Sequence, residues 1–436
     1  MTPSPGGDGI SSQRYHGEND RLAMPSPAPA VGSCPGRAPC PCSGAARSRG
    51  LGPAGRHPMK IAFYLPRMGD GGVVRATLLL AGEFTANGHA VHLVTVQARG
   101  VMYGSLPKGV RLVELGSSRT LSSIPRVAAY LRRERPDAFV AAHYHANIAA
   151  IVAKALARGH ARIVITERVA VGASLLTERG VKGRALRLLV RKTYPRADAV
   201  VTNSLDNSAE LAALFRWPPH RVHTIYNPTF AGDVPQRAAM PVDHPWFQPG
   251  GPPVILSVGR LSPQKDYPTL LRAFARVRRS LPARLVILGE GPVRPELERL
   301  SIELGVQADT ALLGHAPNPY AYMAKAALFV LPSRFEGLPN VLIEAQACGV
   351  PIVSTACPTG PREILLDGEA GALVPVGDPD AMAAEIVSLL RDDARRARYV
   401  AAAAGNLDRF TPRRCYEGYL RLLEGLGVAA RPAPVA

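Results

Sequence analysis

Apolar and polar positions alternate in blocks along most of the chain. Short apolar runs are each followed by a longer stretch in which apolar residues recur at helical spacing. Buried strands and amphipathic helices produce these two patterns, and their alternation favours a parallel, doubly wound α/β sheet. In the first half we expect strands at residues 60–65, 89–96, 110–114, 138–143, 163–166, 199–203 and 222–226.

The same alternation starts again in the second half, with strands expected at residues 254–258 and 285–288. With 436 residues the chain exceeds one typical hydrophobic core, so we expect two α/β domains. The proline-rich stretch 232–253 lacks a period and is the expected linker. We therefore divide the chain into a first domain (59–231), a second domain (254–409), an amphipathic helix (410–428) and a disordered tail (429–436).

Residues 1–58 are rich in Pro, Gly, Ser, Ala and Arg and lack an apolar period, so we expect a disordered extension, with Met59 as an alternative start. It shows no convincing signal or transit peptide, and no run in the chain approaches the ~20 apolar residues that span a bilayer. This extension holds three of the six cysteines. The remaining three, Cys348, Cys357 and Cys415, fall in expected core or helical segments. These features indicate a reduced, cytoplasmic protein.

Positive charge is concentrated in the first domain. Residues 59–231 hold 24 Lys and Arg against 10 Asp and Glu, which is +14 of the formal net charge of +18. One basic group lies at residues 132–135, and another, Arg184, Arg187, Arg191 and Lys192, borders apolar residues. The second group is typical either of an interfacial membrane helix or of an ordinary amphipathic helix with a solvated basic face.

Glu336 and Glu344 lie in the segment 330–363, which we expect to form strand, turn, short helix, strand and the start of another helix. Glu336 is in the turn, and Glu344 is near the start of the helix, for which Asn340 is the expected N-cap and Gly349 the terminating residue. Turns after parallel strands lie at the carboxyl edge of a sheet, where open α/β folds bind ligands. Carboxylates there suit a polyhydroxylic ligand, although a solvated loop Glu and a helix-start Glu explain each residue alone.

Two further polar segments follow apolar strands. Gly259-Arg260-Leu261-Ser262-Pro263-Gln264-Lys265 comes after residues 254–258, and Gly289-Glu290-Gly291-Pro292 comes after residues 285–288. Together with the Glu336 and Glu344 pair, in this order and spacing, the chain resembles the family-4 retaining glycosyltransferases over nearly all of residues 59–428. The resemblance implies the GT-B fold, in which two Rossmann-like domains face a central cleft.

The resemblance also implies roles for individual residues. Arg260 and Lys265 would grip the donor diphosphate, Glu336 would hold the donor sugar, and Glu344 would hold the ribose. Arg260, Lys265, Glu336 and a histidine are the expected catalytic residues. The remaining expected donor-binding residues are Gly71, Gly72, Gly259, Glu290, Gly291, Gly337, Leu338 and Asn340.

The loop Gly69-Asp70-Gly71-Gly72 precedes the first expected helix, 73–86. A dinucleotide-binding fingerprint would need Gly or Ala where Val74 stands, which disfavours a Rossmann oxidoreductase. Amides of Gly71 and Gly72 at a helix N-terminus can still bind a phosphate. The resemblance implies that this loop faces the donor diphosphate and the acceptor. A tight strand-to-helix turn is the alternative.

Two polar clusters follow strands of the first domain, and we expect both to line the same cleft. The first is His143, Tyr144, His145 and Asn147, and the second is Glu167 with Arg168. The family commonly places a His near the donor sugar, and we assign this role to His145, with His143 as the alternative. A structural histidine is about equally consistent with the pattern.

The Asp378-Pro379-Asp380 segment spells a D-x-D, which metal-dependent transferases use to hold a cation. It precedes an expected helix, so N-capping is the favoured interpretation. We therefore expect no metal ion. We also expect no cofactor, because the nucleotide sugar that the resemblance implies would be a substrate.

The sequence thus predicts a metal-independent hexosyltransferase that moves a sugar from a nucleotide-diphosphate sugar to a glycan or lipid-linked acceptor. Surface polysaccharide, lipopolysaccharide or glycolipid assembly is the expected setting, with possible recruitment of the basic first domain to an anionic membrane surface. The alternatives are a nucleotide-sugar epimerase, a non-catalytic binding protein of the same fold, and a nucleic-acid-binding module. The last is disfavoured because the basic stretches hold few aromatic residues. By resemblance, the helix at 410–428 crosses back onto the first domain.

Overall fold

Parallel strands form two separate sheets in the computed structural model, which describes residues 58–69, 72–97, 104–168, 180–229 and 232–428. Within these ranges, seven strands form the first sheet in the order β3-β2-β1-β4-β5-β6-β7, with parallel neighbours throughout. The strands are β1 (Lys60–Arg67), β2 (Ala90–Gln97), β3 (Val110–Glu114), β4 (Ala138–Ala142), β5 (Arg162–Glu167), β6 (Ala199–Thr202) and β7 (Val222–Thr224). Each overlaps a predicted strand, so the parallel α/β prediction is confirmed for this half.

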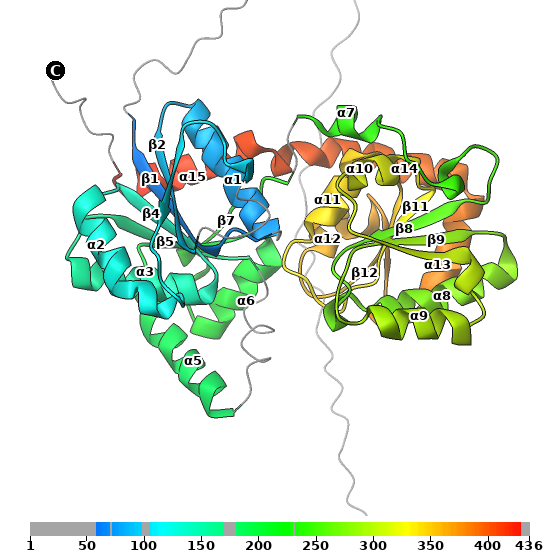
Figure 1. The fold of residues 1–436 in the computed structure, drawn as a ribbon, viewed down its shortest axis with the longest axis horizontal. Coiled ribbons are helices and arrows are strands. Elements are labelled where there is room, and N and C mark those ends of the chain that lie inside the picture. Colours follow the sequence, from blue (N-terminus) through cyan, green and yellow to red (C-terminus); the bar gives the residue numbers. More distant parts are fainter. Residues whose placement is uncertain (1–57, 70–71, 98–103, 169–179, 230–231, 429–436) are drawn as a thin grey trace, which may run out of the picture. The chain divides into compact units, whose positions relative to one another are not determined.

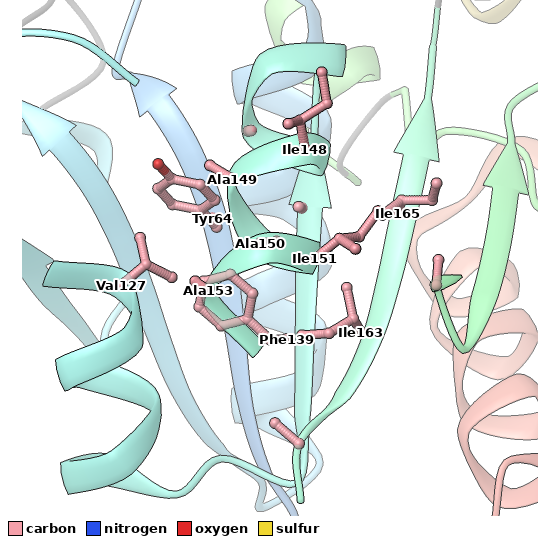
Figure 2. Close-up of a cluster of buried hydrophobic side chains, with 14 of the residues drawn as sticks. Tyr64, Val127, Phe139, Ile148, Ala149, Ala150, Ile151, Ala153, Ile163 and Ile165 are labelled. Atoms are coloured by element: carbon pink, nitrogen blue, oxygen red, sulfur yellow. The ribbon is translucent and has the colours of Figure 1, made fainter. Parts of the chain in front are cut away.

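Helices cover both faces of the first sheet (Figure 1). One face packs against α2 (Ile124–Glu134), α3 (Tyr144–Ala157), α5 (Gly180–Thr193) and α6 (Leu205–Phe215), and the other against α1 (Gly72–Ala86) and α15 (Pro412–Gly425). Figure 2 shows Ile151 of α3 beside Ile165 of β5, and Ala153 of α3 near Phe139 of β4. Small residues such as Ala149, Ala150 and Ala153 allow α3 to lie close to the strands.

The second sheet repeats this plan with six strands in the described ranges, in the order β10-β9-β8-β11-β12-β13. The strands are β8 (Val254–Val258), β9 (Arg284–Leu288), β10 (Thr310–Gly314), β11 (Leu328–Leu331), β12 (Ile352–Thr355) and β13 (Ala372–Val374). One face packs against α8 (Tyr267–Ser280), α9 (Arg294–Glu303), α13 (Pro379–Arg391) and α14 (Asp393–Asn406). The other packs against α10 (Pro319–Lys325), α11 (Asn340–Ala347) and α12 (Pro361–Ile364).

The segment between the two sheets is more ordered than its proline content led us to expect. It includes α7 (Val234–Ala238) and a 3₁₀ turn at Pro245–Phe247. Val234 is buried in the core of the second sheet, and Trp246 packs against the same core. The linker is therefore anchored to the second domain, because its few apolar residues find a buried surface there.

The C-terminal helix α15 belongs to the first sheet although it follows the second in sequence. Its residues Cys415, Tyr416 and Tyr419 are buried in the same cluster as Phe63 of β1 and Phe84 of α1. The chain thus crosses between the two halves twice. Among the described residues, no helix has the length and apolar character needed to cross a membrane. The predicted extension at 1–58 and tail at 429–436 lie outside the described residues, apart from Pro58.

Strand order identifies where each sheet can bind a ligand. In the first sheet, β2 and β3 lie on one side of β1, and β4 to β7 lie on the other side. In the second sheet, β9 and β10 lie on one side of β8, and β11 to β13 lie on the other side. The strand order therefore reverses between β1 and β4, and between β8 and β11. At such a switch point the loops after the two central strands diverge and leave a crevice at the carboxyl edge. The predicted motifs fall on these loops or on the first turn of the helix that follows: Gly72 follows β1, His145 follows β4, Lys265 follows β8 and Glu336 follows β11.

Candidate active site

The loop after β8 carries the predicted diphosphate-binding residues. Gly259 and Arg260 leave the strand, and Lys265 ends a 3₁₀ turn, Pro263–Lys265. The Arg260 side chain is exposed and makes no hydrogen bond or ion pair with the described residues. Tyr267 donates a hydrogen bond from its hydroxyl to the Gly259 carbonyl oxygen at 3.1 Å. Among the described residues, Arg260 is therefore the unpaired cation of this loop. Lys265 follows it at the end of the 3₁₀ turn.

Lys265 forms an ion pair with Glu336, across the switch point. Its Nζ donates to Glu336 Oε1 at 2.7 Å, and the Ser333 hydroxyl donates to the same oxygen at 2.6 Å. The side chains of Lys265 and Glu336 are only 15% and 9% exposed, so little water screens the pair. Two residues that sequence reasoning assigned to the site, 71 positions apart, are thus brought into direct contact.

The turn that carries Glu336 is held by the loop after β12. The Glu336 amide donates to the Pro358 carbonyl oxygen at 2.8 Å. The Thr359 hydroxyl bonds the carbonyl oxygens of Glu336 and Gly337, at 2.8 and 2.9 Å. Gly337 and Leu338 are buried in the same turn. Because Gly337 and Leu338 are buried within the protein, they shape the loop that presents Glu336.

Helix α11 follows this turn, and its start differs from the prediction. Pro339 occupies the N-cap position and Asn340 is the first helical residue, with no side-chain cap. Asn340 as the N-cap was therefore wrong by one position, within the usual uncertainty of helix ends. At the other end Gly349 adopts a φ of 70°, and the Val350 amide bonds the Ala345 carbonyl oxygen at 3.3 Å. The prediction that Gly349 terminates the helix is confirmed.

Glu344 is buried in α11 and contacts a residue of the first domain. Arg75 of α1 donates from Nη1 to Glu344 Oε1 at 2.9 Å, and the Tyr320 hydroxyl bonds the same oxygen at 3.4 Å. Burial raises the pKa of Glu344, and the nearby Arg75 charge and the Tyr320 hydrogen bond oppose that shift. The sequence analysis did not single out either partner. The only signal was that Arg75 lies three residues after Gly72, one helical turn into α1.

The loop after β9 packs against the loop after β8. The Leu261 amide donates to the Glu290 carbonyl oxygen at 2.9 Å, and a Cβ added to Gly291 would lie 2.1 Å from the Leu261 carbonyl oxygen. Gly291 is therefore required by close backbone contact. The Glu290 side chain pairs with Arg294 Nη1 at 2.8 Å. Its predicted contact with a donor stays a prediction.

Two segments of the first domain, after β1 and after β4, carry further predicted site residues. Gly71 lies outside the described residues. Gly72 begins α1, and a Cβ added there would lie 3.1 Å from Asn340 Nδ2. His145, in the first turn of α3, is half-buried, and its ring lies 4.1 Å from that of Tyr144 between centroids. His143 is exposed and immediately precedes the helix.

Asn147 and Glu167 do not line a cleft, which corrects our expectation. Asn147 is fully buried, and its Nδ2 donates to Glu167 Oε1 at 2.8 Å, while Tyr194 donates its hydroxyl to the same carboxylate. Burial raises the pKa of Glu167 to about 7. The two side chains point into the layer between the sheet and α3, where polar groups must pair with one another.

The D-x-D segment caps a helix. Asp378 is the N-cap of α13, and its Oδ1 accepts from the amides of Asp380 and Ala381 at 3.0 and 2.9 Å. Asp380 pairs with Arg276. The prediction of N-capping is confirmed. Within the described ranges no group of three or more His, Cys, Asp or Glu side chains is arranged to hold a metal ion.

Comparison with known families covers both halves of the chain. The family described as Glycosyltransferase Family 4 matches residues 70–229, and the family described as Glycosyl transferases group 1 matches residues 243–405. The chain belongs to the group 1, family-4 type glycosyltransferases. The two matches thus span both halves of the chain.

The chain is also similar in sequence to individual glycosyltransferases. A Campylobacter jejuni enzyme, N-acetylgalactosamine-N,N'-diacetylbacillosaminyl-diphospho-undecaprenol 4-alpha-N-acetylgalactosaminyltransferase, is 38% identical over 213 residues, 49% of this chain and 56% of that protein. The matched part is thus little more than half of that relative. A second C. jejuni protein, GalNAc-alpha-(1->4)-GalNAc-alpha-(1->3)-diNAcBac-PP-undecaprenol alpha-1,4-N-acetyl-D-galactosaminyltransferase, is 27% identical over 378 residues, 84% of this chain and 98% of that protein.

The fold is shared with solved glycosyltransferase structures. Anabaena Alr3699/HepE, solved in complex with UDP and glucose, matches with a TM-score of 0.69 and 19% identity, over 84% of this chain and all of that chain. The two parallel sheets and this similarity identify the fold as GT-B, which confirms the predicted fold class.

Proposed function

We propose that the protein is a retaining hexosyltransferase that moves a sugar from a nucleoside-diphosphate sugar to a hydroxyl of a glycan or lipid-linked acceptor. The observation that carries the proposal is the Lys265 to Glu336 pair at the carboxyl edge of the second sheet. A cation for the leaving diphosphate and a carboxylate for sugar hydroxyls lie together, as transfer from such a donor requires. The shared fold with a protein solved with UDP and glucose is consistent with this assignment.

The leaving group accounts for the basic residues. Departure of a nucleoside diphosphate builds negative charge on a phosphate oxygen, and fixed cations stabilise that charge only if they are already in place. Arg260 is exposed and unpaired among the described residues, so its charge is available to a diphosphate. Lys265 adds a second charge, and the amide of Gly72 at the start of α1 adds a donor. We propose that these groups replace a metal ion.

The carboxylates account for sugar and ribose recognition. The hydrogen bonds that the described residues make to the Glu336 side chain, from Lys265 and Ser333, both reach Oε1. Its other oxygen is available to accept from donor sugar hydroxyls, which would orient the anomeric carbon. Loss of Glu336 should then lower turnover more than donor affinity. Glu344 would accept from the ribose hydroxyls.

We propose front-side attack, in which the leaving phosphate oxygen takes the proton of the acceptor hydroxyl and the anomeric configuration is retained. His145, in the first turn of α3, is the residue proposed to lie near the donor sugar. Proton NMR of the purified product tests the stereochemistry, since axial and equatorial anomeric linkages give different couplings. An inverted linkage would contradict the mechanism and leave the transferase assignment intact.

A lipid-linked acceptor is supported by the C. jejuni relatives, whose names describe diphospho-undecaprenol and PP-undecaprenol substrates. Helix α5 supports recruitment to the cytoplasmic face of a membrane, because Arg184, Arg191 and Lys192 are exposed beside the exposed Leu188. Each basic residue near anionic lipid contributes about 1 kcal/mol. Flotation with vesicles of phosphatidylcholine alone or mixed with phosphatidylglycerol tests this step. Equal partitioning into both would contradict it.

The direct test is transfer of labelled sugar from a panel of nucleotide sugars to diphospho-undecaprenol-linked acceptors in the presence of EDTA. The proposal predicts a glycolipid product from one donor. A nucleotide-sugar epimerase would alter the sugar and form no glycoside, and a non-catalytic protein would bind the donor without turnover. A nucleic-acid-binding module would instead show steeply salt-dependent RNA or DNA binding with no sugar chemistry.

A further inference from the structure

The carboxylate proposed to hold the donor ribose belongs to the second domain, yet its strongest partner belongs to the first. Arg75 Nη1 lies 2.9 Å from Glu344 Oε1, and the two residues are 269 positions apart. The side chain of Glu344 is 12% exposed and that of Arg75 is 32% exposed. An arginine this close to a buried carboxylate fixes its charge and its orientation together.

Tyr320 contacts both Arg75 and Glu344, so the three side chains form one cluster. Its hydroxyl accepts a hydrogen bond from Arg75 Nη2 and bonds Glu344 Oε1, and its ring is fully buried. The guanidinium of Arg75 lies 5.5 Å from the ring centroid, and that of Arg237 lies 4.5 Å from it. Arg75 is thus held both by a charge partner and by an aromatic face.

The two oxygens of Glu344 differ as a result. The Arg75 and Tyr320 contacts both fall on Oε1, and among the described residues no hydrogen bond reaches Oε2. A carboxylate anchored through one oxygen presents the lone pairs of the other in a fixed direction. That is the geometry needed to accept hydrogen bonds from two neighbouring hydroxyl groups.

We propose that Arg75 is a positioning residue for ribose recognition: it anchors Glu344 through Oε1 so that Oε2 faces the ribose hydroxyls of the donor nucleotide. This inference rests on the proposed function. It means that α1 of the first domain completes a donor contact made by α11 of the second. The nucleotide is then bound with full ribose discrimination only when the two domains are docked at this point.

The test compares nucleotides that differ only in the ribose hydroxyls. Titration calorimetry first identifies which of UDP, GDP and ADP binds the wild-type protein. The 2′,3′-dideoxy form of that nucleotide is then titrated. A hydrogen bond to a charged group is strong enough that the wild type should prefer the ribose form by about tenfold or more. Arg75→Met should reduce this preference to less than about twofold.

The affinity of Arg75→Met for the dideoxy nucleotide serves as the folding control, because the inference predicts that it stays close to the wild-type value. Arg237→Met is the matched control: it removes the other guanidinium on the Tyr320 ring but leaves the Arg75 contact, and should keep the full ribose preference. Tyr320→Phe removes one hydrogen bond to Oε1 and should reduce the preference partially, which provides a second variant if Arg75→Met does not fold.

The possible failures are distinguishable. A wild-type protein that binds none of the three nucleotides would overturn the proposed function, and the inference with it. A wild-type protein that discriminates strongly, together with an Arg75→Met variant that discriminates equally well, would overturn the inference alone. Equal loss of preference in Arg75→Met and Arg237→Met would also overturn it, because the effect would then belong to the Tyr320 ring.

Discussion

Arg260 and Lys265 are proposed to stabilise the same leaving group, yet the structure predicts different consequences when each is replaced by methionine. Arg260 is exposed and contacts no described partner, whereas Lys265 pairs with the buried Glu336 at 2.7 Å. Methionine keeps most of the aliphatic part of both side chains and removes the charge. The pair of variants therefore separates a loss of catalysis from a loss of stability.

The catalytic cost should be similar in both variants. Removing one fixed donor from a developing oxyanion costs about 3 kcal/mol, or 10²- to 10³-fold in turnover. The effect on stability should differ. Arg260→Met should change the free energy of unfolding by less than about 0.5 kcal/mol, as surface substitutions usually do. Lys265→Met leaves a buried carboxylate without its cation, which costs about 3 kcal/mol.

Turnover of the identified donor and unfolding in urea would be measured for both variants and for Lys265→Met combined with Glu336→Gln. The double variant should regain stability, because no charge remains buried, and should stay inactive. Near-normal turnover in both single variants would refute the diphosphate assignment. A stability loss in Arg260→Met as large as in Lys265→Met would refute the argument from burial.

Three further predictions concern pH, a helix cap and a glycine. Burial raises the pKa of Glu167 from 4.5 to about 7, so the folded state holds a proton that the unfolded chain releases, and stability should fall by up to about 3 kcal/mol between pH 4.5 and 7. Glu167→Gln should remove this part of the pH dependence in urea titrations at pH 5 and 8. Asp378→Ala should lower the free energy of unfolding by about 1 kcal/mol and leave turnover unchanged with or without EDTA. A loss of turnover restored by a divalent cation would contradict the capping role. Gly291→Ala places a Cβ 2.1 Å from a carbonyl oxygen of the neighbouring loop and should weaken nucleotide binding in calorimetry, whereas Gly251→Ala, whose nearest contact would be 3.8 Å, should not.

Local patterns were sufficient for the strands of the first sheet, for β8 and β9, and for the helix ends at Gly349 and Asp378. The parallel strands are apolar runs bounded by polar turns, and Asp378 before a proline-started helix is a complete local signal for an N-cap. The contact between Lys265 and Glu336 was within reach, because both follow central strands of one parallel sheet. Such strands end at a common edge whatever the details of packing.

Other contacts depend on packing that no local pattern encodes. Arg75 meets Glu344 only because two domains dock, and an arginine on an amphipathic helix otherwise predicts a solvated face. Asn147 and Glu167 resembled cleft residues because both follow strand ends. Both side chains are in fact buried, and the Tyr194 hydroxyl, from a separate 3₁₀ turn, donates a hydrogen bond to the Glu167 carboxylate. Polar residues paired inside a layer cannot be told from exposed ones by composition.

The most direct test of the central claim is donor binding and hydrolysis across a panel of nucleotide sugars, with EDTA present, for the wild type and Glu336→Ala. The account predicts that one donor binds selectively, that its nucleoside diphosphate is released slowly despite EDTA, and that release is lost in the variant. Binding of no donor, or equal release by Glu336→Ala, would contradict the assignment of this edge of the second sheet as the donor site.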